Sequence, residues 1–258
     1  MTVDHSIKRE KKSAMGFFLF AALTLREVFH IPSNRHVSSM VMLRQILFTG
    51  YEALPLISFL ALAIGGLVIL QGTNLLSGFG QGIWVHIVLV TVVVNELSGI
   101  LTALVVVARS GTAISTELGN MRVRREIDLI ESFGISPISY LVLSRIIGVV
   151  VAMVILVLYF NFVAVLGGWL FSRMFSHLEF QAFMSEFLSV LKLSHIFSSL
   201  IKSIVFGLII STVSTYQGMS VGHASTEVPQ RTIRAVVTSI FAVILSDMLI
   251  TWLFWIFR

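Results

Sequence analysis

The sequence predicts an all-α polytopic membrane protein with five transmembrane helices, an N-terminal interfacial helix and one charged cytoplasmic helix. Of the 258 residues, 56% are apolar and 12% are charged, whereas a soluble domain has roughly 25% charged residues. The apolar residues form long continuous runs, while a transmembrane β-barrel would show segments of about ten residues with alternating polarity. The sequence contains no cysteine, which excludes disulfides and thiolate metal sites.

Residues 1–50 are predicted to lie outside the bilayer core, on the cytoplasmic side. Residues 1–12 are polar and basic. The aromatic-rich segment 14–29 has an apolar core shorter than the roughly 20 residues of a spanning helix, so we expect an interfacial helix there. No small-residue cleavage site follows it, which argues against a cleavable signal peptide. A second amphipathic piece covers residues 37–49.

Five apolar runs are long enough to cross a bilayer. The first contains Gly65-Gly66, with Ala61 one turn earlier, so another helix can approach it closely. An interfacial helix is expected in the loop 172–196, and 217–231 is expected to be a short polar connection. The predicted spans are 53–72, 83–107, 140–170, 197–216 and 233–257.

The segment 117–134, between the second and third spans, holds much of the charge in this charge-poor sequence. Its apolar residues Val123, Ile127 and Ile130 recur at the spacing of one helix face. Gly134 is placed to end a helix. We therefore expect an amphipathic helix of about four turns, which either lies solvated on the membrane surface or docks on a protein; its well-formed apolar face favours docking. The charged residues elsewhere on the helical wheel are Arg124, Arg125, Asp128 and Glu131.

The distribution of basic residues predicts which side of the membrane this helix faces. Cytoplasmic segments of membrane proteins carry an excess of Lys and Arg. With the N-terminus in the cytoplasm, fourteen Lys and Arg residues fall on cytoplasmic segments and four fall on the opposite side. The segment 117–134 is therefore expected to be cytoplasmic and the C-terminus to be on the other side.

The most informative ionisable side chains inside the apolar runs are Glu96, Lys202 and Asp247. Glu96 precedes Arg109 by 13 residues, which places it about 20 Å from the expected cytoplasmic end of its helix. Asp247 follows Ile233 by 14 residues, which places it at a similar depth of about 21 Å. Ionisable groups at this depth are costly and face a cavity or a partner. Glu96 and Asp247 are either functional or satisfied by Lys202, a hydroxyl or a neighbouring subunit, and Lys202 itself either contributes or snorkels outward. Asn95 and Gln71 are able to hydrogen-bond between helices.

Motifs of catalysis are absent from the sequence. It has no G-x-x-x-x-G-K-[ST] phosphate loop, no H-E-x-x-H zinc helix and no G-x-S-x-G turn. The seven histidines show no metal-ligand spacing. We therefore expect a non-catalytic chain with no cofactor, and any ATP-driven function needs a separate ATPase chain.

The charged segment and its flanks resemble the MlaE permease family, the membrane subunits of ABC transporters that move phospholipids with MCE-domain partners. The resemblance begins at 109–114 and continues through 117–123, 127–128 and 136–142. Further matching positions are Gln71-Gly72, Asn95-Glu96-Leu97, Ile201-Lys202-Ser203 and Asp247. It covers most of residues 40–257.

The resemblance implies that residues 1–258 form a single permease domain, which works as a homodimer in the bacterial inner membrane. It implies a periplasmic C-terminus, a lipid cavity between the subunits that opens toward a periplasmic MCE-domain protein, and ATP bound by a cytoplasmic ATPase subunit. No nucleic-acid partner is expected. The segment 117–134 becomes a coupling helix, with the expected coupling residues Glu117, Met121, Val123, Arg124, Arg125, Ile127, Asp128 and Glu131.

The lipid cavity implied by the resemblance has polar and apolar residues. The polar groups are expected to meet the lipid headgroup and the apolar ones the acyl chains. The expected lipid-binding residues are Val68, Gln71, Leu75, Leu76, Phe79, Asn95, Glu96, Leu97, Lys202 and Asp247.

The sequence departs from the family at two places and leaves rival functions open. At 95–99 the family commonly has Arg-Glu-Leu-Gly-Pro, and this chain has Asn-Glu-Leu-Ser-Gly. The basic side chain that the family would place in the cavity is therefore replaced by the amide of Asn95. Glu-Gln before Ile-Asp is replaced by Arg125-Glu126, which indicates a matched change in the ATPase groove. The main rival is an ion-coupled secondary transporter that uses Glu96 and Asp247 as proton carriers. Two weaker rivals are a structural scaffold and a membrane-embedded lipid enzyme.

Overall fold

The computed structural model describes residues 20, 39–76, 83–176, 179–222 and 224–256. Within these residues all regular secondary structure is helical, and there are no strands. Five helical stretches are long and apolar enough to cross a membrane, and each overlaps one predicted span, so the predicted five-span fold is confirmed. These stretches are Leu43–Thr73, Ile83–Val123, Ile138–Phe175, Leu193–Met219 and Glu227–Ile256.

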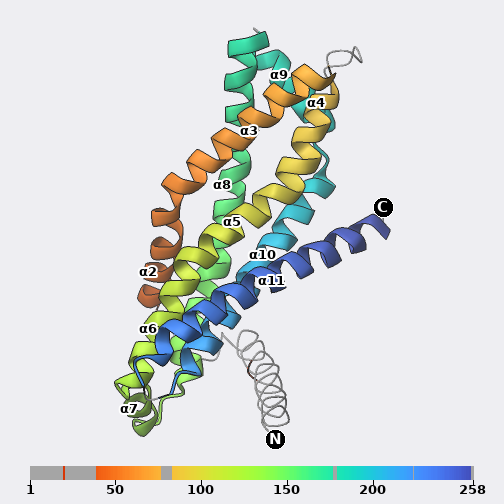
Figure 1. Ribbon diagram of the computed structural model, residues 1–258. Coiled ribbons are helices and arrows are strands. Elements are labelled where there is room, and N and C mark those ends of the chain that lie inside the picture. The colour runs from red at the N-terminus through yellow and green to blue at the C-terminus, as the bar shows by residue number, and fades with distance from the viewer. Residues whose placement is uncertain (1–19, 21–38, 77–82, 177–178, 223, 257–258) are drawn as a thin grey trace, which may run out of the picture.

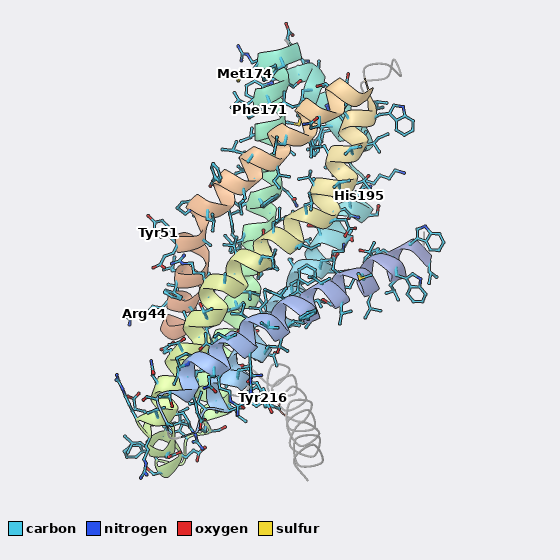
Figure 2. All side chains as sticks on the ribbon, in the orientation of Figure 1. Arg44, Tyr51, Phe171, Met174, His195 and Tyr216 are labelled. Carbon is cyan, nitrogen blue, oxygen red and sulfur yellow. The ribbon has the colours of Figure 1, made fainter. Side chains whose placement is uncertain are left out.

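The first span is longer than predicted because the preceding amphipathic piece joins it. Helix α2 (Ser39–Gly50) passes through the single turn η2 (Tyr51–Ala53) into α3 (Leu54–Leu76). Figure 2 shows Arg44 and Tyr51 on the outer side of this stretch, and both are exposed. The predicted interfacial helix at 14–29 lies outside the described residues, apart from residue 20.

The helix of the second span continues without a break into the charged segment and ends at Val123, rather than near residue 107 as expected. Arg109 lies inside this helix, where its guanidinium pairs with Glu52 and lies over the ring of Phe48, 5.8 Å from the centroid. The stretch alternates between α- and π-helical turns: α4 (Ile83–Val88), η4 (Leu89–Leu97), α5 (Ser98–Val106), η5 (Val107–Gly111) and α6 (Thr112–Val123).

The segment 117–134 forms two helical pieces rather than the single helix of about four turns that was expected. Helix α6 ends at Val123, and Arg125 has a left-handed backbone conformation with φ of 58°. A new helix, α7 (Glu126–Ser132), starts after it in another direction. The left-handed conformation costs roughly 1–2 kcal/mol for a residue with a side chain, so the change of direction must be held by contacts that α7 makes.

The predicted end of this segment at Gly134 is confirmed. Gly134 has φ of 76°, a conformation that glycine adopts without steric cost. Its N–H donates to the carbonyl of Glu131 at 2.9 Å, and the N–H of Ile135 donates to the carbonyl of Ile130 at 3.3 Å. These two bonds form a Schellman motif, which satisfies carbonyls that the helix end leaves unpaired.

The remaining helices complete the bundle. The turn η6 (Ile138–Val142) leads into α8 (Leu143–Ser176), whose 34 residues extend about 51 Å, well beyond a hydrocarbon core of about 30 Å. Helix α9 (Phe180–Val190) lies within the loop where a helix was expected. The last two helices are α10 (Leu193–Met219) and α11 (Glu227–Ile256). Helix α11 begins inside the segment 217–231, which was expected to be a polar connection.

Helix α8 is the centre of the packing. It contacts α2, α3 and α10, and α10 in turn contacts α6 and α11. The expected close approach at Gly65 is confirmed, because a Cβ atom there would overlap the backbone carbonyl of Ala164 on α8. In Figure 1, α7 and α9 lie at opposite ends of the bundle, and the C-terminal end of α11 extends away from the other helices.

One side-chain hydrogen bond links α3 to α8 within this packing. The hydroxyl oxygens of Ser58 and Tyr159 are 2.7 Å apart. We expect Tyr159→Phe, which removes only the hydroxyl, to destabilise the fold by about 1 kcal/mol. Thermal unfolding in detergent should show a lower midpoint than for Tyr51→Phe, a control at a tyrosine that is 72% exposed. Equal midpoints for the two variants would show that the bond contributes nothing.

Candidate functional site: a buried charge cluster and an exposed terminal helix

Three charged side chains from three different spans meet inside the bundle. The ammonium nitrogen of Lys202 on α10 lies 2.5 Å from Oε2 of Glu96 on η4 and 2.9 Å from Oδ1 of Asp247 on α11. The side chains of Lys202, Asp247 and Glu96 are 1%, 10% and 28% exposed, respectively. We call these three residues the charge cluster. Its cation is fully enclosed, and its accessible member is the carboxylate of Glu96.

Neighbouring polar groups hold Glu96 in place. The side-chain amide of Asn95 donates to Oε1 of Glu96 at 3.3 Å, and the hydroxyl of Thr251 lies 3.2 Å from Oε2. Lys202 also donates to the backbone carbonyl of Asn95 at 3.2 Å. Asn95 and Glu96 belong to a π-helical stretch, a feature that is frequent at functional sites.

The cluster agrees with the similar depths expected for Glu96 and Asp247 and decides between two interpretations of Lys202. Glu96 and Asp247 were expected at similar depths, and the structure joins them through one cation. The interpretation that Lys202 snorkels outward was wrong: its side chain is buried because two carboxylates compensate its charge. Removing a charged group from water is unfavourable unless it is paired in this way.

The other expected cavity residues are less tightly connected. Helix α3, which carries Val68 and Gln71, contacts η4. Val68 and Leu97 are partly buried against the core, and Gln71 is exposed. Phe79 lies outside the described residues, as do the side chains of Leu75 and Leu76.

Sequence reasoning missed Thr251 as part of this site. It lies on α11 four residues after Asp247, and residues at this spacing occupy the same helix face. This i+4 relation to an intramembrane aspartate is the signal that could have identified it.

The second candidate region is α7, where the expected apolar face turns inward. Ile127 is fully buried, and Met121 and Ile130 pack against the core. These contacts hold α7 against the bundle and balance the cost of the left-handed turn before it. The large apolar side chains that α7 and the residue after it expose are instead Leu129 and Phe133, at 57% and 72%. They are four residues apart, on the helix side opposite Ile127, a pattern that sequence analysis had not used.

Several charges of this region are paired within the chain. Arg122 lies 2.6 Å from Asp128, and Arg145, whose side chain is 8% exposed, lies 2.9 Å from Glu117. Arg124 makes a longer contact with Glu126, at 3.8 Å. Val123 is partly buried, whereas Arg124, Arg125 and Glu131 are exposed. The charges most accessible to a partner are therefore Arg124, Arg125 and Glu131.

An all-helical polytopic membrane protein with paired charges buried within its spans and a short helix exposed at one end has the architecture of a transporter permease. The family model described as Permease MlaE matches residues 42–253. The chain belongs to the MlaE family of ABC transporter permeases, so it is the non-catalytic membrane subunit of such a transporter and has an ATPase partner.

Individual relatives are similar over most of the chain. A probable ABC transporter permease protein of Rickettsia prowazekii is 31% identical over 250 residues, which are 97% of this chain and 95% of that protein. The chloroplastic protein TRIGALACTOSYLDIACYLGLYCEROL 1 of Arabidopsis thaliana is 29% identical over 209 residues, 81% of this chain and 60% of that protein. The intermembrane phospholipid transport system permease protein MlaE of Haemophilus influenzae is 24% identical over 239 residues, 92% of this chain and 88% of that protein.

Proposed function

We propose that this permease moves phospholipids between the bacterial inner membrane and a periplasmic MCE-domain partner, as a homodimer driven by its ATPase. The charge cluster is the observation that carries the proposal. Charged groups at this depth are costly, and they mark pathways for polar or charged cargo. The permease of Haemophilus influenzae, which is described as part of an intermembrane phospholipid transport system, supports the choice of a phospholipid.

The surroundings of the cluster suit a cargo with one polar and one apolar end. Glu96 is the accessible polar member. Helix α11 presents large exposed apolar side chains beside Asp247 and Thr251, among them Met248 and Trp252. A headgroup beside Glu96 would leave its acyl chains along this face of α11. In this arrangement the headgroup contacts Asn95, Glu96, Lys202 and Asp247. The side of the cavity nearer α3 is formed by Val68 and Gln71 of α3 and by Leu97 of η4.

The coupling role falls to α7 at the cytoplasmic end. Leu129 and Phe133 dock into the ATPase, while Arg124, Arg125 and Glu131 set the register through charge pairs. Ile127 joins α7 to the bundle, so that movement of the ATPase reaches the spans. The opposite end, with α9, faces the periplasm and the MCE-domain protein; Figure 2 places Phe171 and Met174 there. ATP binds to the partner chain, and the permease needs no cofactor.

Reconstitution tests this proposal against ion-coupled transport. The permease and its ATPase are placed in donor vesicles with a labelled phospholipid, and transfer to an MCE-domain acceptor is followed. We expect transfer that requires ATP and stops with a catalytically dead ATPase. Transfer driven by a proton gradient without nucleotide would favour the secondary transporter instead, and the absence of any phospholipid transfer would contradict the proposal.

A further inference from the structure

The charge cluster carries one negative charge more than it can balance. It contains two carboxylates, Glu96 and Asp247, and one ammonium, Lys202. Among the described residues, Lys202 is the single cation paired with either carboxylate. An unbalanced charge inside a membrane is costly, so the site favours one further positive charge.

The cluster is also short of hydrogen-bond donors. Lys202 has three N–H donors; it donates to the Asn95 carbonyl and to Glu96. It is also ion-paired with Oδ1 of Asp247, 2.9 Å from its ammonium nitrogen, so it has no donor left for a further acceptor. The side-chain oxygen of Asn95 is buried without a hydrogen-bond donor. One buried acceptor therefore remains unpaired beside an excess negative charge.

We propose that the cluster is a binding site for the primary ammonium of a phospholipid headgroup, as in phosphatidylethanolamine. This inference rests on the proposed function and adds the part of the headgroup that the site recognises. An ammonium brings one positive charge and three donors, which are the two things that the cluster lacks. It reaches the site at Glu96, whose carboxylate is the most accessible of the three charges.

The same observations argue against the phosphate as the group that enters. A phosphate is an anion with only acceptor oxygens, and the single cation nearby, Lys202, is 99% buried behind two carboxylates. Phosphate at Glu96 would meet like charge, which is unfavourable. The quaternary ammonium of a choline headgroup supplies the positive charge but no N–H donor. It should bind with intermediate strength.

Position 95 makes this preference specific to the present sequence. An arginine there would supply a second cation and balance the cluster without a ligand. This chain has Asn95, whose amide donates to Glu96 but carries no charge. The ammonium of the lipid takes the place of the missing cation. Asn95→Arg should therefore remove the preference without removing any carboxylate.

Lipid competition tests the proposal. The purified permease–ATPase complex is delipidated in mild detergent and incubated with equal amounts of phosphatidylethanolamine and N-acetylated phosphatidylethanolamine with the same acyl chains. Native mass spectrometry then measures the bound ratio. We expect an enrichment of about tenfold for the free amine, the size of one charge-assisted hydrogen bond. The enrichment should disappear in Glu96→Gln and in Asn95→Arg.

Glu179→Gln is the matched control, because it neutralises an exposed carboxylate just before α9, outside the charge cluster, and should keep the full enrichment. Equal binding of the two lipids to the unmodified complex overturns the inference. This is the result expected if a proton on one of the carboxylates, and not a lipid ammonium, neutralises the excess charge. Enrichment that persists in both Glu96→Gln and Asn95→Arg also overturns it. Binding of both lipids without preference leaves phospholipid transport standing, whereas binding of neither contradicts the proposed function itself.

Discussion

Lys202→Met is expected to cause the largest loss of stability among single substitutions in the charge cluster. It would leave the carboxylates of Glu96 and Asp247 inside the bundle without their shared cation. Removing one partner of a buried ion pair costs about 3–5 kcal/mol, because the remaining charge is uncompensated. The three spans that meet at the cluster should separate. The midpoint of thermal unfolding in detergent and the rate of ATP-driven lipid transfer should both fall sharply.

Two further variants make this prediction specific to the charge. Lys192→Met removes an exposed lysine and should leave both measurements unchanged. The triple variant Lys202→Met, Glu96→Gln, Asp247→Asn has no charge left in the cluster and should recover the unfolding midpoint but not lipid transfer. If the triple variant were as unstable as Lys202→Met alone, packing around the lysine stem would explain the loss better than charge.

Replacing Leu129 and Phe133 together by serine is expected to abolish coupling while leaving the fold intact. Both side chains are more than half exposed, so their removal creates no cavity. Hot-spot residues at the centre of an interface each contribute about 2 kcal/mol or more. Losing one would weaken ATPase association about thirtyfold, and losing both would weaken it by several hundredfold. Stimulation of the ATPase by lipid and lipid transfer should both disappear. The unfolding midpoint of the permease alone should not change.

Ile127→Ala gives the contrasting result from the other side of the same helix. Ile127 is fully buried, and truncating a buried isoleucine to alanine costs about 2–5 kcal/mol. The midpoint should fall in this variant and not in the Leu129, Phe133 double variant. If the two variants exchanged these behaviours, α7 would bind the ATPase through its buried face after reorienting, contrary to our proposal.

The sequence predicted the parts of this fold that depend on periodicity and composition. The five spans follow from apolar runs of sufficient length, and the helix end at Gly134 follows from the conformational freedom of glycine. The similar depths of Glu96 and Asp247 follow from the rise of a helix. These features are local, so one segment of the sequence contains the information that determines each of them.

Features that depend on contacts between segments were missed or predicted wrongly. The helix of the second span continues past Arg109, whose charge is paired with Glu52, a residue distant in sequence. The break at Arg125 has no breaker residue at that position, and its cause lies in the burial of Ile127 and the pairing of Asp128 with Arg122. For the same reason, helical periodicity identified an apolar face on α7 but left open whether this face packs on the ATPase or on the membrane-side helices.

The measurement that tests the account most directly is photo-crosslinking of phospholipid beside the charge cluster in the working complex. A diazirine amino acid replaces Thr251, next to Glu96, and in a control it replaces Phe162, which is 63% exposed on α8. We predict that ATP changes the yield of phospholipid crosslinked at 251 and leaves the yield at 162 constant. A yield at 251 that is the same with ATP, without ATP and with a catalytically dead ATPase would contradict a transport path through the cluster.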